Sequence, residues 1–337
     1  MVPDISIVIV NYKTPSLTDI CIGSIYQFTE GLDFEIVLVD NDSQDESKSL
    51  ITTKYPNVKW VDSGSNAGTS VAYNIGVKNS IGEYILILNS DTEFRENTIK
   101  KCLDVYKSKE QSEKIGLLGC QLVGYDSIIQ FNSNIKFPTI KDFLRGNSLF
   151  IKLGLYQDKI TENERLVLHQ KDHKSEWLGI VFGIVNADVF RKENAYFDED
   201  IFMYSDEVDW CFRLKQMGYN HYFTTCSTLL HWNGGSSTNF SEWRYGQIII
   251  SNWLCIMKIY GKFYYLMCMI VFGINFFTDE AFYWKNKIVS SISDIDNEQR
   301  FYRILDAKIF FRYFFTIFFT YKQTPSSRGA FLKYQIN

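Results

Sequence analysis

The sequence predicts an α/β fold, an open and mostly parallel sheet whose strands are joined by crossover helices. Three short apolar runs rich in β-branched residues carry this prediction, at 5–10, 35–39 and 84–88. Near-continuous runs of this kind are typical of strands that helices cover on both faces. Segments that can form helices separate the runs, so strand and helix alternate along the chain as a parallel sheet requires.

The remaining elements of the first hundred residues follow from these runs. A helix begins at about Ser16, and a weaker strand at 58–61 precedes the glycine-containing loop 63–68. A second helix then extends to about Ser80. Ligands of open α/β sheets bind at the carboxyl ends of the strands, so the polar residues at those ends are candidate site residues.

The middle of the chain, 104–176, is more polar and predicts less regular structure. His169 and His173 are one helical turn apart there, a spacing that could bind a metal ion. The segment is strongly charged and offers no further ligands, so we expect a solvated loop or helix face instead. The α/β pattern resumes over 177–232.

Length and charge restrict the classes of function. The 337 residues suffice for two domains, or for one large domain with an appendage. A formal charge of −4 and a pI near 5.7 argue against a nucleic-acid-binding role. Seven cysteines without a Cys-x-x-Cys pair predict reduced thiols in a cytosolic setting. The apolar run 5–10 is too short for the core of a signal peptide.

Aromatic side chains dominate the C-terminal region. The apolar run 263–277 is shorter than a membrane span. In 308–321 a narrow polar stripe recurs every fourth residue, which predicts a helix lying in a membrane interface. The alternative is a helix pair packed on the domain or on a second copy in a homodimer. The membrane is favoured because so many phenylalanines on one segment would otherwise form a large exposed patch. The stripe is Lys308, Arg312, Thr316 and Thr320, and the rest is covered by Phe310, Phe311, Phe314, Phe315, Phe318 and Phe319.

Three acidic residues, Asp206, Glu207 and Asp209, stand at the start of a predicted helix over 208–217, which Gly218 is placed to end. The positive end of the helix dipole favours their ionised form, and an ionised carboxylate on a rigid element can act as a general base. A structural interpretation competes with this one: Asp206 caps the helix, and Asp209 pairs with Arg213 one turn later.

Polar clusters also end the predicted strands. Asp91 follows 84–88 and is a plausible ligand for Mg²⁺ or Mn²⁺ on a diphosphate, although a turn role is equally open. Asp40 ends the neighbouring strand and could accept hydrogen bonds from a nucleobase or ribose. Gly68 would let the backbone approach a ligand closely. His231 ends a further strand before a Gly/Ser turn, and it could bind a metal ion.

The order of these clusters resembles that of the family 2 glycosyltransferases with a GT-A fold, especially a bacterial rhamnosyltransferase-like branch. The resemblance covers about residues 5–255. The matching pieces are Ile7-Val8-Ile9-Val10-Asn11-Tyr12, Val39-Asp40-Asn41-Asp42-Ser43, Asn66-Ala67-Gly68 through Asn74-Ile75-Gly76, Leu88-Asn89-Ser90-Asp91, Phe197 to Tyr204, Asp206 to Cys211, and His231 with its Gly-Gly-Ser.

The resemblance implies a role for each residue. Glu207 would be the general base with Asp206 in reserve, and Asp91 and His231 would hold a divalent metal, Mg²⁺ or Mn²⁺. Asn89 replaces the first acid of the family's Asp-x-Asp, a departure that weakens the case for tight metal binding. The donor-binding residues would be Asn11, Asp40, Asn41, Asn66, Gly68, Asn74, Asn89, Ser236 and Ser237, and the acceptor-binding residues Trp177, Gly183 and Asp209.

The resemblance also implies the domains and the reaction. A GT-A domain would span 1–255, with a donor half at 1–105 and an acceptor half at 106–255, before an aromatic helical region at 256–337. The enzyme would transfer rhamnose or another hexose, with inversion, from a dTDP- or UDP-sugar to a hydroxyl of a polyprenyl-diphosphate-linked or cell-surface glycan. We expect it in the cytoplasm, peripheral at the inner face of the membrane.

Two other functions are weighed against this one. A sugar-phosphate nucleotidyltransferase can share the sheet, but it needs a glycine-rich, basic loop after the first strand, which 11–15 does not supply. A catalytically degenerate protein, serving as a partner subunit or glycan-binding module, is favoured by Asn89 alone. The presence of Asp91, Glu207 and His231 together argues against it.

Overall fold

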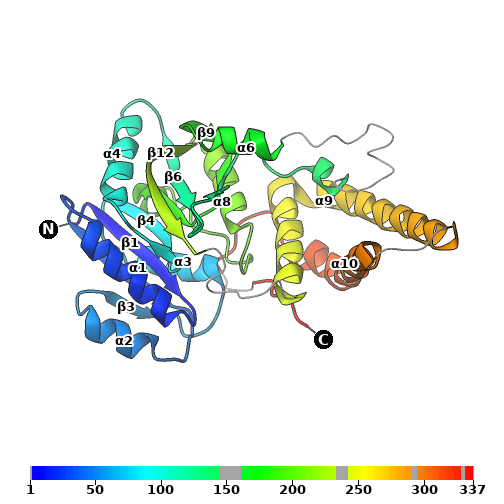
Figure 1. Cartoon of the computed structure of the whole chain (residues 1–337), viewed down its shortest axis with the longest axis horizontal. Coiled ribbons are helices and arrows are strands. Elements are labelled where there is room, and N and C mark those ends of the chain that lie inside the picture. Colours follow the sequence, from blue (N-terminus) through cyan, green and yellow to red (C-terminus); the bar gives the residue numbers. More distant parts are fainter. Residues whose placement is uncertain (1, 145–160, 233–241, 290–293, 328–330, 337) are drawn as a thin grey trace. The chain divides into compact units, whose positions relative to one another are not determined.

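The computed structural model describes residues 2–144, 161–232, 242–289, 294–327 and 331–336 (Figure 1). The chain forms two compact units. The first is Met1–Phe137, Glu162–Phe240 and Ser326–Phe331, and the second is Pro138–Thr161, Ser241–Pro325 and Leu332–Asn337. A short segment near the C-terminus, Ser326–Phe331, belongs to the first unit.

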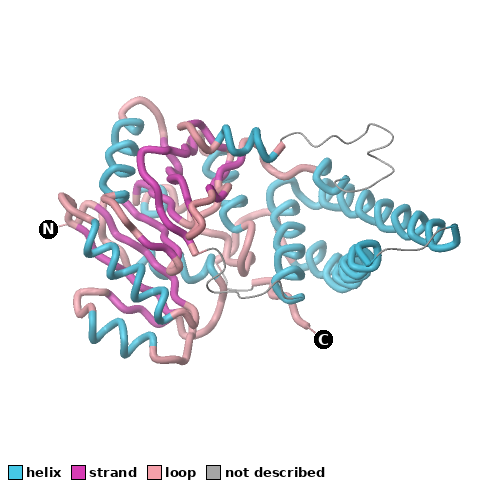
Figure 2. Tube along the Cα trace, viewed as in Figure 1, coloured by secondary structure: helices cyan, strands magenta, loops and turns pink. Residues whose placement is uncertain are grey.

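A mostly parallel sheet forms the centre of the first unit (Figure 2). Among the described residues its main strands are β1 (Ile5–Asn11), β2 (Phe34–Asp40), β3 (Lys59–Asp62), β4 (Tyr84–Asn89), β5 (Thr92–Glu93), β6 (Ile115–Val123), β11 (Phe182–Asn186) and β12 (Asn220–His231). They run in the order β3-β2-β1-β4-β11-β6-β12-β5. β1 is parallel to both β2 and β4, β12 is parallel to β6, and β11 is antiparallel to β4. The predicted α/β fold is confirmed.

Four short strands complete the pairing. β7 (Ile129–Gln130) pairs with β6, and β9 (His173–Ser175) pairs with β12. β8 (Ser133–Asn134) and β10 (Trp177–Leu178) form a separate antiparallel ribbon.

Helices bury both faces of the sheet, which explains the continuous apolar runs. Ile5, Ile7 and Ile9 of β1 lie in a core with α1 (Pro15–Phe28), α2 (Ser47–Lys54) and α4 (Thr98–Glu110). Val8 points to the opposite face, in a core with α3 (Thr69–Lys78), α7 (Asp188–Arg191) and α8 (Asp206–Gln216). Because side chains alternate along a strand, both kinds of residue must be apolar.

The structure corrects the prediction of an irregular middle in its first part, whereas beyond β6 the described residues up to 176 form only short elements. α4 continues to Glu110, and β6 is a central strand whose Leu117 and Leu118 are fully buried. α6 (Glu162–Leu168) ends before His169, which is buried rather than solvated. The Nε2 atom of His169 accepts the backbone N–H of Ser133 at 3.0 Å. This histidine is therefore a structural residue.

Two long helices form most of the second unit, which also contains the 3₁₀ helix η1 (Ile140–Leu144). α9 (Glu242–Val289) is interrupted at Gly261, whose φ of 85° and ψ of 173° are not helical. Among the described helices, α9 alone has the length and hydropathy to cross a membrane, over Glu242–Ala281, and half of its most apolar window is buried in the protein. Core helices of soluble proteins share these properties.

α10 (Asp294–Thr320) covers the predicted helix over 308–321 except for its last residue, and it begins 14 residues earlier. Its phenylalanines divide between two directions. Phe310 stacks on Phe272 and Phe314 on Tyr265, both of α9. A second set faces solvent: Phe311, Phe315 and Phe319 are 72%, 60% and 70% exposed. One set of phenylalanines therefore pairs α10 with α9, and the other set is exposed.

Candidate active site

Asn11 and Asp40 end two neighbouring parallel strands in register. The Asn11 Nδ2 group donates to Oδ1 of Asp40 at 2.7 Å and to the Ser43 hydroxyl at 3.0 Å, while its Oδ1 accepts from Thr14 and Thr18. Asn11 is fully buried. Both ends of its amide are used inside the protein, so Asn11 orients Asp40, and its direct contact with a donor stays a prediction.

The loop after β3 lies against the end of β2. The Asn41 Nδ2 group donates to Oδ1 of Asn66 at 3.2 Å and to the Gly68 carbonyl at 3.4 Å. Gly68 has a φ of 89° and a ψ of 179°, and a Cβ there would lie 1.9 Å from the carbonyl oxygen of Phe202. Glycine alone tolerates this conformation and this approach. The structure therefore brings three of the predicted donor residues together.

Asn74 braces the fold. It is buried, its Nδ2 group donates to the Phe197 carbonyl at 2.9 Å, and its Oδ1 accepts the Phe197 N–H at 2.9 Å. The Nδ2 group also donates to Glu199 at 3.1 Å. These bonds tie α3 to the segment that leads into the acidic cluster, so the predicted contact with a donor is not supported for Asn74.

Asp91 and His231 lie together, as a metal site requires. Nε2 of His231 is 3.4 Å from Oδ1 of Asp91, and both side chains are largely buried. Trp232 donates its backbone N–H to the Asp91 carbonyl at 3.0 Å, which fixes the two segments to each other. The described residues contain no cluster of three or more His, Cys, Asp or Glu side chains arranged for a metal ion. Two protein ligands fit a cation whose other ligands are phosphate oxygens and water.

Asp206 and Glu207 open α8 after two residues in the left-handed region, Tyr204 with φ 65° and Ser205 with φ 61°. Such backbone strain concentrates at functional sites. Ser205 is the N-cap, so the prediction that Asp206 caps the helix is wrong. Asp206 instead lies in the first turn, where its Oδ2 accepts the Thr69 hydroxyl at 2.9 Å. The acids and the start of α3 therefore face one another.

Burial raises the pKa of both acids. The neighbouring Asp206 charge raises the pKa of Glu207 further, and Glu207 also hydrogen-bonds to Asp206. Hydrogen bonds with Glu207, with the Thr69 hydroxyl and with backbone N–H groups of the first turn offset part of the increase in the pKa of Asp206. The pKa of Glu207 is therefore raised well above its usual value. A raised carboxyl pKa suits a general base that works near neutral pH.

Tyr73 connects the two groups of acids. Burial raises the pKa of its hydroxyl, and the charges of Asp206, Glu207 and Asp91 raise it further. The hydroxyl donates to Oδ1 of Asn89 at 3.0 Å. Sequence reasoning missed Tyr73 and also Thr69, one helical turn away. Their spacing on the helix after the Gly68 loop was the available signal.

The predicted acceptor residues are scattered. Trp177 is partly exposed on β10, where its Nε1 group donates to the Lys136 carbonyl at 3.0 Å. Gly183 is buried in β11, and a Cβ there would lie 2.7 Å from Leu117. Asp209 is buried and pairs with Arg213 at 2.8 Å, as the structural interpretation predicted. Packing within the protein therefore accounts for both Gly183 and Asp209. Ser236 and Ser237 lie outside the described residues.

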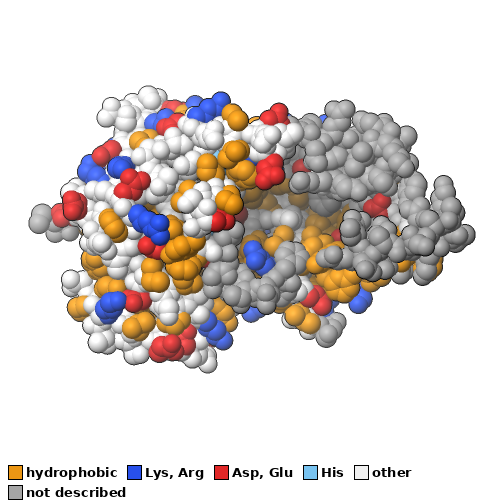
Figure 3. Space-filling view, in the orientation of Figure 1, with side chains coloured by type: hydrophobic (Ala, Val, Ile, Leu, Met, Phe, Trp, Pro, Cys, Tyr) orange, Lys and Arg blue, Asp and Glu red, His pale blue; other side chains and the backbone are white. Residues whose placement is uncertain are grey.

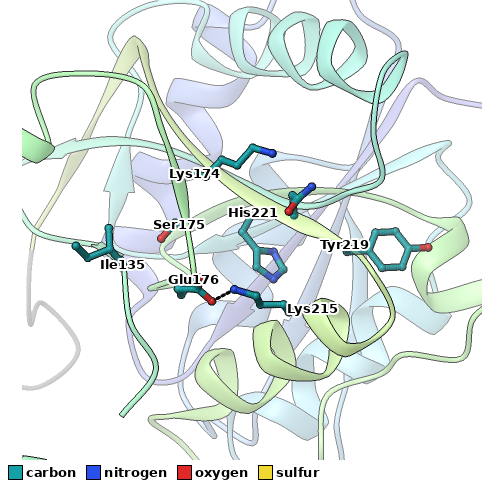
Figure 4. Close-up of a pocket in the computed structure, with 8 residues that line it drawn as sticks. Ile135, Lys174, Ser175, Glu176, Lys215, Tyr219 and His221 are labelled. Atoms are coloured by element: carbon teal, nitrogen blue, oxygen red, sulfur yellow. Dashed lines mark hydrogen bonds and ion pairs between the residues drawn. The ribbon is translucent and has the colours of Figure 1, made fainter. Parts of the chain in front are cut away.

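A separate pocket of about 270 Å³ lies where β12 begins, whereas His231 stands where that strand ends (Figure 4). Its lining includes the ion pair of Lys215 with Glu176. His221 in this pocket is fully bonded: Nδ1 accepts the Leu117 N–H at 3.1 Å and Nε2 donates to the Cys211 carbonyl at 2.9 Å. Burial lowers the pKa of His221 to about 4. None of the site residues predicted from the sequence lines this pocket.

Residues 6–154 match the sequence profile of the family described as Glycosyl transferase family 2. A hexosyltransferase of low-salt glycan biosynthesis from Haloferax volcanii is 26% identical over 65% of this chain and 64% of its own. An N-acetylglucosaminyl-diphospho-decaprenol L-rhamnosyltransferase from Mycobacterium tuberculosis is 23% identical over 58% of this chain and 66% of its own. The chain thus matches slightly under two thirds of the length of these relatives.

The fold is similar to that of solved glycosyltransferases. A mannosyltransferase from Pyrobaculum calidifontis, in complex with GDP-Man and Mn²⁺, superposes with a TM-score of 0.54 at 11% identity. This match covers 94% of the present chain and 88% of the other. At this identity the likeness concerns the fold alone.

Proposed function

We propose that this chain, which belongs to glycosyl transferase family 2 and has a GT-A fold, transfers a hexose from a nucleoside-diphosphate sugar to a hydroxyl group of a lipid-linked glycan. One observation carries the proposal: α3 reaches both groups, because Thr69 donates to Asp206 at 2.9 Å and Tyr73 donates at 3.0 Å to Asn89, two residues before Asp91. A base and a site for a diphosphate-bound cation therefore share one region. The hexosyl- and rhamnosyltransferase relatives support the substrate class.

The residues of the site would act in the following way. Asp40, oriented by Asn11, and the loop of Asn66 and Gly68 would bind the nucleoside. Glu207, whose pKa is raised by burial and by the Asp206 charge, would remove the proton from the acceptor hydroxyl as the hydroxyl oxygen attacks the anomeric carbon. Attack from the face opposite the leaving diphosphate inverts the configuration in one displacement.

Asp91 and His231 are the residues that would hold Mg²⁺ or Mn²⁺. Carboxylate and imidazole are suitable ligands, and their 3.4 Å separation suits two ligands of one ion. When bound, the cation would neutralise the charge that develops on the leaving diphosphate. The amide of Asn89 cannot supply the negative charge of a second carboxylate, so the diphosphate itself must contribute most of the remaining ligands.

A thermal-shift experiment tests the donor proposal. We expect the unfolding temperature to rise with UDP or dTDP and their sugars, and to rise further with Mn²⁺ or Mg²⁺, because ligands that bind only the native state stabilise it. ATP and AMP serve as controls. Absence of any shift would contradict the donor proposal and favour a catalytically degenerate protein, the function that Asn89 alone supports.

We also propose that α10 holds the enzyme at the cytoplasmic face of the membrane, close to a lipid-linked acceptor. Phe311, Phe315 and Phe319 form an exposed stripe, which we call the Phe stripe, and Lys308 and Arg312 are exposed on the same helix. Hydrophobic side chains gather over the visible part of α10 in Figure 3. Aromatic residues with flanking cations are typical of helices that bind anionic lipid surfaces.

Vesicle flotation tests the membrane proposal. Changing the Phe stripe to serine should reduce binding to anionic vesicles at least about 10-fold, since each Phe contributes about 1.5–3 kcal/mol on burial. Serine at the exposed Val2, Ile81 and Val167 of the first unit is the matched control. Substitution is preferred to truncation because Ser326, beyond α10, bonds to Asp198 and Glu199. If the Phe-stripe variant floats with vesicles as well as the wild type does, the proposal is refuted. It is also refuted if the substitutions convert a dimer to a monomer and leave vesicle binding unchanged.

A further inference from the structure

The side chain of Gln130 makes two hydrogen bonds to His231. Its Nε2 group donates to the His231 backbone carbonyl at 3.0 Å, and its Oε1 atom lies 2.6 Å from Nδ1 of the His231 ring. Strand pairing brings the two residues together: Gln130 ends β7, β7 pairs with β6, and β6 pairs with β12, which His231 ends.

These two bonds determine the tautomer of His231. A backbone carbonyl only accepts hydrogen bonds, so the amide nitrogen of Gln130 must be the end that faces it. The amide oxygen therefore faces the ring. Because that oxygen also only accepts, Nδ1 of His231 must carry a hydrogen, and the neutral ring has its lone pair on Nε2.

This lone pair faces Asp91. Nε2 of His231 is 3.4 Å from Oδ1 of Asp91, so when the ring is neutral two electron-rich atoms face each other in a largely buried place. That arrangement is favourable when a positive charge lies between them. The opposite tautomer would turn an N–H group toward Asp91, where it would occupy the position of a cation.

We propose that Gln130 is a positioning residue that prepares His231 to bind a divalent cation through Nε2, an inference that rests on the proposed function. Metal-binding histidines commonly donate their other N–H group to a fixed acceptor, which sets the ring orientation and the tautomer. Gln130 fixes the ring and the backbone of His231 at the same time. The metal ligand therefore arrives at Asp91 already oriented.

The first test is the tautomer itself, read from ¹⁵N–¹H spectra of the imidazole groups in the metal-free protein. The chain has only four histidines, and His231→Asn identifies the signal of His231. We expect Nδ1 protonated in His231 and Nε2 protonated in His221, whose Nδ1 accepts the Leu117 N–H. Nε2 protonation in neutral His231 would overturn the proposal, whether or not the variants fold.

The second test is Mn²⁺ affinity, measured by electron paramagnetic resonance of free Mn²⁺ with and without UDP. Gln130→Leu should weaken Mn²⁺ binding by about 10- to 100-fold, the usual effect of removing such a partner. Gln130→Glu keeps an acceptor for the Nδ1 hydrogen, so it should retain at least the wild-type affinity and the wild-type tautomer. Rescue by Gln130→Glu separates positioning of the ring from general stability.

Gln121→Leu is the matched control. The Gln121 Nε2 group donates to the His169 carbonyl at 2.7 Å, so this variant also removes a bond between a glutamine and a histidine backbone. We expect no change in Mn²⁺ affinity. If the wild type binds Mn²⁺ and Gln130→Leu binds it equally well, Gln130 does not position His231. The proposed transferase function is then unaffected. If the wild type binds no Mn²⁺ either with or without UDP, both the proposed metal dependence and the proposed role of Gln130 are refuted.

Discussion

Replacing Glu207 with glutamine should lower kcat by about 10²- to 10⁴-fold, the usual contribution of a general base. Glutamine keeps the size of the side chain and its ability to hydrogen-bond to Asp206, but it cannot take up a proton. Donor binding should remain, since the proposed donor contacts come from other residues. Turnover of the nucleotide sugar gives kcat, and the thermal shift with UDP or dTDP reports donor binding. A kcat within threefold of the wild type would exclude Glu207 as the base.

The pH dependence of the wild type should follow from the same pair. The base acts only when deprotonated, and burial together with the Asp206 charge raises the pKa of Glu207, so kcat should rise as the pH increases through that pKa. Asp206→Asn removes the charge and should move this rise to lower pH. An acidic limb that stays in place in Asp206→Asn would show that another group controls the rate.

Replacing Gly68 with alanine should have the largest effect on stability among single substitutions in the donor loop. The new Cβ would lie 1.9 Å from the Phe202 carbonyl oxygen, so backbone must move, and the Thr69 N–H would lose its 2.8 Å bond to that oxygen. We expect the free energy of unfolding to fall by about 3–5 kcal/mol, the range of severe substitutions. Binding of UDP or dTDP should be lost as well.

Gly64→Ala provides the matched control in the same loop. Gly64 also has a positive φ, 80°, but no atom lies within 4 Å of the position of its Cβ. Its replacement should therefore show only the backbone strain, about 1–2 kcal/mol. Urea denaturation measures both variants. Equal losses would mean that φ strain alone accounts for the effect and that the contact with Phe202 has no separate role.

Local patterns in the sequence were sufficient for much of the fold. The continuous apolar run of β1 required helices on both faces, and Gly218 ended the predicted helix of the acidic cluster, as φ 86° just after α8 confirms. The middle of the chain was misjudged because β6 is enclosed by polar segments that hide its apolar run. α4, which extends into that region, was not predicted.

The candidate site was likewise predicted only in part from the sequence. The sequence by itself determined which residue types end the strands, and so it identified Asp40, Asp91 and His231 as candidates. It did not show that Asn11 and Asn74 are fully bonded inside the protein, because a buried amide and a ligand-binding amide look alike in a sequence.

Only the tertiary structure decided how these groups meet. Thr69 bonds to Asp206, Tyr73 reaches Asn89, and Gln130 fixes His231, across separations of 137, 16 and 101 residues. Such contacts depend on which strand lies beside which, and sheet order is set by the packing of the whole unit instead of by any local pattern. The residue types of the candidate site could therefore be predicted from the sequence. The orientation of these side chains and the positions of their protons depend on the folded sheet.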